Sequence, residues 1–244
     1  MSDLPQTDWS MLHDLHGGES AREQAMERLV RRYWGAIYAY IRRTGRDVHE
    51  SSDLTQGFIT TVILERNLGQ RADKSRGRFR SLLLTSLRNY LHERHRHEAR
   101  RKRSGGDERP GGAAFQPFDV DAAEGRNYDT PEAAFSYHWS AALVRAVLEK
   151  VRTGCLRDGL EMHWSVFDAR VARPLLFGEP APPMQELIDR FDLPGSAQAS
   201  NMLITVKRRF ARAIREEVAA TVASEDEVED ELLELLKDLE RRRG

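Results

Sequence analysis

The stretch RGRFRSLLLTSLRNYLHERHRHEARRKR, residues 76–103, decides how the N-terminal half of this chain folds. Its apolar residues recur every three or four positions, which is the spacing of one face of an α-helix. That face holds Phe79, Leu82, Leu83, Leu84, Leu87, Tyr90 and Leu91. The stretch therefore predicts an ordered helix from Phe79 to about Arg103 with one buried face, and not a disordered basic tail.

The same region concentrates positive charge. Residues 71–103 hold twelve Lys and Arg residues against three acidic ones, a net charge of +9, although the whole chain of 244 residues has a formal net charge of −1. Solvated helix faces usually mix the two signs so that residues four apart can pair, and this run does not. A local positive field suits a polyanion, so the run predicts binding to nucleic acid.

Composition and the absence of several patterns limit the other possibilities. Hydrophobic residues make up 40% and charged residues 32%, without the alternating runs that predict strands, so an all-α protein is expected. No apolar stretch approaches the roughly 20 residues that span a bilayer, and the first residues do not resemble a secretory signal. No contact with a membrane is therefore expected. A single cysteine, Cys155, cannot form an internal disulfide, which favours the reducing cytoplasm.

Residues before the basic helix predict two further helices. The first runs from Glu23 to Thr44 and ends at Gly45, because glycine is favoured just after a helix. The second begins near Ser51 or Ser52, either of which can cap its N-terminus. The buried positions expected for these two helices are Ala25, Leu29, Tyr33, Ile37, Tyr40, Ile41, Leu54, Phe58, Val62, Ile63 and Leu64.

Beyond the basic helix the composition changes. Residues 104–129 are rich in Gly, Pro and acids and predict a flexible acidic linker. Thr130 and Pro131 then predict a helix start, because Thr caps well and Pro suits the first helical turn. Further helical pieces are expected at 160–177, 184–191 and 196–220, and the last two, joined by a short turn with a glycine, predict a helix-turn-helix.

The last of these helices carries side chains suited to reading duplex DNA. With Ala199, Leu203, Val206 and Phe210 on its inner face, its outward residues are Gln198, Ser200, Asn201, Thr205 and Arg208. Gln and Asn can bind adenine through two hydrogen bonds in the major groove, and Arg suits guanine or phosphate. The end of the chain, 223–244, is expected to form an acidic amphipathic tail around Leu232, Leu235, Leu236 and Leu239.

Patterns for catalysis or metal binding are missing. The chain has no glycine-rich phosphate loop and no nucleophile elbow, and Cys155 is more easily explained as a packing residue, so no enzyme is expected. His92, His95 and His97 do not follow the two-histidine spacing of helical metal sites. Neither a metal nor a cofactor is therefore predicted.

Four short segments resemble a known family in their order along the chain. They are Arg32-Tyr33-Trp34, then residues 53–58 (DLTQGF), then residues 76–84 (RGRFRSLLL), then residues 87–91 (LRNYL). Together they look like the N-terminal domain of bacterial RNA polymerase sigma factors of the extracytoplasmic-function type, in a planctomycete-like subgroup. The second half is similar, more loosely, to the second domain of that family.

The resemblance implies two helical domains and a division of labour between them. Residues 1–103 would bind core RNA polymerase and the minus-ten promoter element, 104–130 would be the linker, 131–222 would bind the minus-thirty-five element, and 223–244 would be the tail. The implied function is to direct the polymerase to specific promoters and to help melt promoter DNA and initiate transcription. An anti-sigma factor or a regulatory kinase is a further candidate partner.

Site residues follow from the same resemblance. The polymerase contacts would be Asp53, Leu54, Gln56 and Phe58. Contacts to the melted minus-ten strand and its backbone would come from Arg78, Phe79, Arg80, Arg88, Asn89, Arg94 and Arg96, and the minus-thirty-five element would be read by Gln198, Ser200, Asn201, Thr205 and Arg208. The chain departs from the family at Leu82, where Trp is usual, and at Ser200 and Thr205, where basic residues are common.

Two other functions remain open on the sequence. A stand-alone helix-turn-helix regulator would bind closed duplex DNA without polymerase. An RNA-binding structural protein would use the basic helix alone. DNA binding with and without core polymerase discriminates these alternatives from the sigma-factor prediction.

Overall fold

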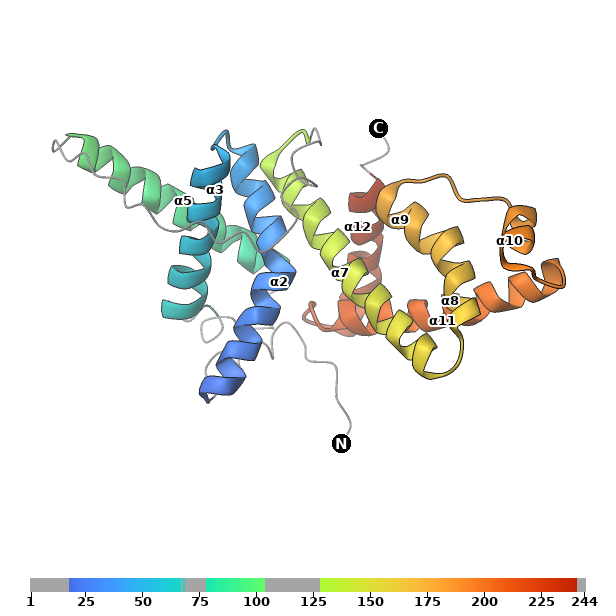
Figure 1. The fold of residues 1–244 in the computed structure, drawn as a ribbon. Helices are drawn as coiled ribbons and strands as arrows, with labels where there is room; N and C mark the ends of the chain where they lie inside the picture. The colour runs from blue at the N-terminus through green and yellow to red at the C-terminus, as the bar shows by residue number, and fades with distance from the viewer. Residues whose placement is uncertain (1–17, 67, 69–77, 104–127, 241–244) are drawn as a thin grey trace. The chain divides into compact units, whose positions relative to one another are not determined.

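The computed structural model describes residues 18–66, 68, 78–103 and 128–240, and the regular structure in these ranges is helical, without a strand (Figure 1). This confirms the all-α prediction for the described part of the chain. The chain divides into two compact units, Met1–Trp139 with Ala220–Glu225, and Ser140–Ala219 with Asp226–Gly244. The expected domain ranges stay predictions, and residues 104–127 of the expected linker lie outside the described residues.

The first unit begins with helix α2 (Glu19–Arg43), which ends before Gly45 as predicted. Gly45 has a φ of +89°, a conformation that glycine adopts without strain. Helix α3 (Val48–Phe58) starts earlier than expected, because the carboxylate of Asp47 accepts a hydrogen bond of 2.8 Å from the backbone N–H of Glu50. The prediction of a cap at Ser51 or Ser52 is therefore wrong. A π-helical segment, η1 (Ile59–Glu65), continues α3.

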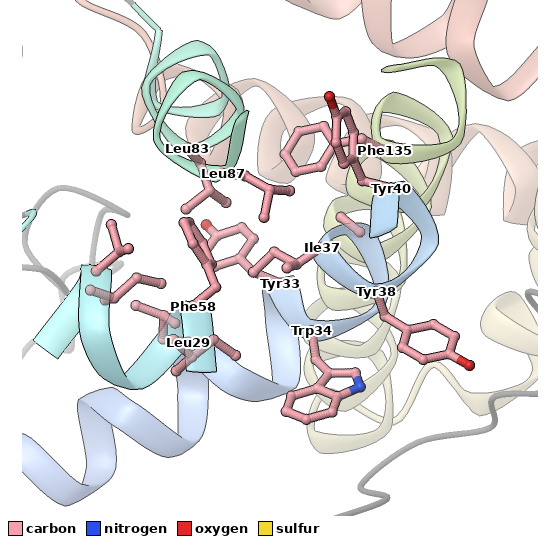
Figure 2. Close-up of a cluster of buried hydrophobic side chains, with 14 of the residues drawn as sticks. Leu29, Tyr33, Trp34, Ile37, Tyr38, Tyr40, Phe58, Leu83, Leu87 and Phe135 are labelled. Carbon is pink, nitrogen blue, oxygen red and sulfur yellow. The ribbon is translucent and has the colours of Figure 1, made fainter. Parts of the chain in front are cut away.

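Helix α5 (Phe79–Arg103) has the bounds that the sequence predicted. Its side chains Phe79, Leu83 and Leu87 are at most 1% exposed. They pack with α2 and α3 in one aromatic-rich core, part of which Figure 2 shows. The first N–H of α5 donates to the carbonyl of Thr221, 3.0 Å away, so residues 220–225 return to this unit and satisfy a helix-end donor.

Helix α7 (Pro131–Arg157) begins as predicted, since the Thr130 hydroxyl accepts a hydrogen bond of 3.1 Å from the N–H of Ala133. Its first residues complete the core of the first unit. Trp139 stacks on Tyr33 with ring centres 4.7 Å apart and lies 5.7 Å from Phe79. The buried area of such large rings makes this cluster a main source of stability in the unit.

The second unit contains the rest of α7 and a set of shorter helices. These are α8 (Glu161–Phe167), the π-helical η3 (Asp168–Ala172), α9 (Arg173–Phe177), α10 (Met184–Phe191), α11 (Ser196–Ala219) and α12 (Val228–Glu240), the last preceded by the short η4 (Glu225–Glu227). Helix α11 packs against α8, α10 and α12. Through the described residues, every helix is too short or too polar to cross a lipid bilayer.

Helix α12 is built from the acidic end of the chain. The expected apolar face is confirmed for Leu235 and Leu239, which are buried, but Leu236 is 48% exposed. Two acids, Glu231 and Asp238, are buried on the inner side instead. The hydroxyl of Ser140 donates to the Asp238 carboxylate at 3.2 Å, which satisfies part of that buried acid.

Candidate nucleic-acid interfaces

Helix α5 presents exposed cations beyond its N-terminal half, which is fixed in the core by Phe79, Leu83 and Leu87. Arg88, Asn89, Arg94 and Arg96 are all exposed, as their assignment to a nucleic-acid surface requires. Three histidines on the same helix, His92, His95 and His97, are exposed as well. No group of three or more potential metal ligands occurs in the part of the chain that the structure describes.

The two acids of α5 are paired with arginines from other segments. Arg66, just after η1, lies 2.8 Å from Glu93, and Arg46, just before α3, lies 3.8 Å from Glu98. The hydrogen bond from Arg66 holds the pKa of Glu93 below its ordinary value. The acids of the helix are thus occupied by neighbours, and Arg94 and Arg96 form no ion pair with any described residue.

Arg88 is engaged inside the first unit. Its guanidinium lies 2.5 Å from the Glu132 carboxylate of α7 and also hydrogen-bonds the Tyr40 hydroxyl. The contact lowers the pKa of Glu132 and raises that of Arg88, while burial raises the pKa of Tyr40. A phosphate that binds Arg88 must therefore compete with Glu132 for the same guanidinium.

The start of α5 differs from an open binding surface. Phe79 is 1% exposed and packs against the stacked rings of Tyr33 and Trp139, with ring centres 5.5 Å and 5.7 Å away. Its ring is therefore not available to a nucleotide in this conformation. Arg78 and Arg80 are half-buried beside it. The loop that precedes them, residues 69–77, lies outside the described residues.

The four residues expected to contact the polymerase divide into two pairs. Asp53 and Gln56 are exposed on α3. Leu54 and Phe58 are buried, at 4% and 0% exposure, and belong to the core of the first unit, in which Figure 2 labels Phe58. Only the first pair can be changed without disturbing the packing of the unit, so Asp53 and Gln56 are the residues on which a contact is best tested.

In the second unit, α10 and α11 are joined by a tight turn. Asp192 ends α10 with a φ of +49°, a left-handed conformation that Asp tolerates better than most residues, and Gly195 has a φ of +157°. The residues expected to read DNA project from the outer side of α11, where Gln198, Asn201 and Arg208 are exposed and Ser200 and Thr205 are half-exposed. The Thr205 hydroxyl donates to the carbonyl of Asn201 at 2.9 Å.

Two cations of α11 are held by acids of the same unit. Arg209 lies 2.7 Å from Asp158, and its hydrogen bond, together with that of Arg157, lowers the pKa of the Asp158 carboxyl. Arg215 forms an ion pair with Glu229 of α12. Arg208 and Lys207 form no ion pair with the described residues. They remain available for phosphate.

Sequence reasoning missed one residue of this face. Ile204 is 45% exposed, and the outward residues predicted for this helix did not include it. It lies three residues after Asn201 and four before Arg208, so the helical repeat alone places it between them. The helical repeat in the sequence was thus sufficient to place Ile204 outward, but its apolar side chain does not fit the polar pattern expected of a DNA-reading face.

Cys155 is fully buried, and burial raises the pKa of its thiol. It therefore has the properties of a packing residue, because a reactive cysteine needs an exposed thiolate.

No protein-family model matches this chain, and comparisons with curated proteins and with solved structures found no match either.

Proposed function

We propose that this protein is a sigma factor of the extracytoplasmic-function type. It binds core RNA polymerase, directs it to specific promoters and helps to separate the DNA strands at the start of transcription. It acts through binding energy and not as an enzyme. Its partners are core polymerase and promoter DNA, and its place of action is the cytoplasm.

The observation that carries the proposal is the exposed cationic face of α5. Arg94 and Arg96 are exposed on the part of the helix that follows buried Tyr90, and Glu93 and Glu98 are paired with arginines from outside the helix. An exposed helical segment whose acids are already paired leaves its cations to the phosphates of a DNA strand. Exposed Asn89 adds a side chain that can hydrogen-bond a base edge.

Strand separation needs a compensating interaction. Unstacking and unpairing a base costs a few kcal/mol, which favourable contacts to the extruded strand must offset. The cationic face of α5 would provide the contacts to the backbone, and core polymerase would hold the complex on the DNA. This is why the proposal requires the two proteins to act together.

A stand-alone regulator of transcription is the second candidate. It is favoured by the outer face of α11, where Gln198, Asn201 and Arg208 are exposed after a tight turn from α10. Such a face suits the major groove of closed duplex DNA. This protein would bind its site equally well with and without polymerase.

Run-off transcription separates the two candidates. Core RNA polymerase of the source organism is mixed with the full-length chain and a library of genomic promoters. The proposal predicts specific transcripts that require the chain. Duplex binding without any such transcripts would support the regulator instead.

A variant of α3 tests the contact to the polymerase. Asp53→Ala combined with Gln56→Ala alters two exposed side chains and should reduce co-purification with core polymerase at least several-fold. His49→Ala, exposed on the same helix, is the matched control and should leave co-purification unchanged. Equal co-purification of both variants would remove α3 from the proposed interface.

A further inference from the structure

An isoleucine stands in the middle of the polar outer face of α11. Ile204 is 45% exposed, with exposed Asn201 one turn before it and exposed Arg208 one turn after it. Single apolar residues on a protein surface are common and need no explanation. The position of this one is informative because its neighbours along the helix are the side chains suited to base and phosphate contacts.

The packing of α11 keeps Ile204 outside. Leu203 and Val206 are 5% and 0% exposed on the opposite side, so the helix cannot rotate to bury Ile204 without exposing its core residues. The nearest polar side chain in sequence, Thr205, has its hydroxyl hydrogen committed to the Asn201 carbonyl. Its hydroxyl can therefore only accept from a ligand, and Ile204 offers an exposed apolar group beside it.

We propose that Ile204 is a specificity-determining residue that recognises thymine through its C5-methyl group in the major groove. The inference rests on the reading of duplex DNA by α11, which the proposed sigma factor would use at the minus-thirty-five element and which the regulator would use at its own site. Among the base edges in the major groove, thymine offers a methyl group, whereas the other bases offer mainly hydrogen-bond donors and acceptors. Ile204 would desolvate those polar groups without pairing them, which disfavours other bases at this position.

Replacement of thymine by deoxyuridine tests this contact, since it removes only the methyl group. Duplexes are first selected from a random library by the full-length chain, with and without core RNA polymerase. Each thymine of the selected site is then replaced by deoxyuridine, and the dissociation constant is measured. For the wild type we expect one thymine at which the replacement weakens binding about fourfold, as for the loss of one buried methyl group.

The same replacement is measured with three variants. Ile204→Ala should bind the thymine duplex more weakly and show no further loss with deoxyuridine. Leu156→Ala, which alters a residue of similar exposure (42%) on α7, should keep the fourfold loss. Arg212→Ala should weaken binding to all duplexes alike, as expected for a phosphate contact. Circular dichroism checks that each variant is folded.

The outcomes separate the inference from the function on which it rests. A deoxyuridine penalty that persists in Ile204→Ala, or no such penalty in the wild type, overturns the role of Ile204 and leaves duplex reading by α11 intact. Failure of the wild type to select any duplex overturns the proposed reading of DNA by α11, and the inference with it.

Discussion

Tyr90 illustrates how single residues fix the cationic helix in place. Its ring lies against Phe58 with centres 5.7 Å apart, and burial raises the pKa of its hydroxyl. Its hydroxyl also lies over Gly57 of α3, where a Cβ would come within 2.4 Å of the oxygen. Glycine at this position therefore allows α3 and α5 to approach each other.

Replacement of that glycine should loosen the contact. Gly57→Ala forces the Tyr90 ring to move, and such overpacking typically costs about 1–3 kcal/mol of unfolding free energy. The matched control is Gly35→Ala on α2, where a Cβ would meet no atom within 4 Å. This change should be neutral or stabilise by up to about 1 kcal/mol, because alanine favours helix. Urea unfolding measures both, and equal stability of the two variants would contradict the packing described for Tyr90.

At the scale of elements, the arginines of α5 predict a salt dependence. Arg94→Ala combined with Arg96→Ala should weaken binding to a fluorescent single-stranded DNA. It should also make the slope of log K against log salt shallower by about 1.4, since each phosphate contact to a single strand contributes about 0.7. Fluorescence anisotropy over a range of salt concentrations measures the slope.

A variant with the same loss of charge controls this measurement. Arg28→Ala combined with Arg31→Ala removes two exposed cations from α2 and should leave the slope nearly unchanged. If both double variants change the slope equally, net charge and not the face of α5 determines the binding.

The link between α5 and α7 predicts a pH dependence. Arg88 lowers the pKa of Glu132 in the folded state. The pair therefore stabilises the folded state fully at pH values above the ordinary carboxyl pKa of about 4.3. This stabilisation is lost as the pH falls through the lower pKa that Glu132 has in the folded state. Between pH 5 and 3, about the range in which carboxyls titrate, wild-type stability should fall more steeply than that of Glu132→Gln.

The carboxyl itself provides a second measurement. In Arg88→Ala, the pKa of Glu132, followed by NMR, should rise toward its ordinary value. The side chain of Glu132 is 38% exposed, so solvent screening makes the effect on stability modest. The pairing is contradicted if the unfolding free energies of wild type and Glu132→Gln change in parallel with pH and the pKa of Glu132 in the wild type has its ordinary value. The pair would then not persist in solution.

The sequence predicted helices well where their ends carry unambiguous caps. Thr130 and Gly45 mark helix ends because each has one structural role there. The start of α3 was misplaced because Asp47, Ser51 and Ser52 are all good caps, and only tertiary packing decides among them. It buries both serines, Ser51 fully, and leaves Asp47 at the end of the helix.

Candidate site residues were harder to predict than helices. The helical period predicted Phe79 on the buried face of α5, and the structure confirms this, with Trp139 packed on its ring. The resemblance assigned the same ring to the melted DNA strand, which its burial does not allow in this conformation. Ile204 is the opposite case, an apolar residue on an outer face. The packing of Trp139 on Phe79 depends on contacts between distant segments, which the local pattern does not contain.

At the scale of the whole molecule, α12 is a packed part of the second unit. Leu235 is 4% exposed, and Asp238 accepts a hydrogen bond from Ser140 of α7. Leu235→Ala should therefore cost about 2–5 kcal/mol of unfolding free energy, as for other buried leucines. Leu233→Ala, at 54% exposure on the same helix, should change it by less than about 0.5 kcal/mol.

Thermal and urea unfolding of the two variants measure this difference. Equal stabilities would mean that α12 does not pack on the second unit in solution. A large difference would confirm that α12 is part of the folded core of the second unit.

The central claim is that the chain helps to separate promoter strands only together with core RNA polymerase. Permanganate, which oxidises unpaired thymines, tests this directly on a promoter selected by the two proteins. We predict reactive thymines near the start site when both proteins are present, none with either alone, and a strong reduction with Arg94→Ala combined with Arg96→Ala. Absence of reactive thymines with both proteins present, or the same reactivity without the chain, would contradict the claim.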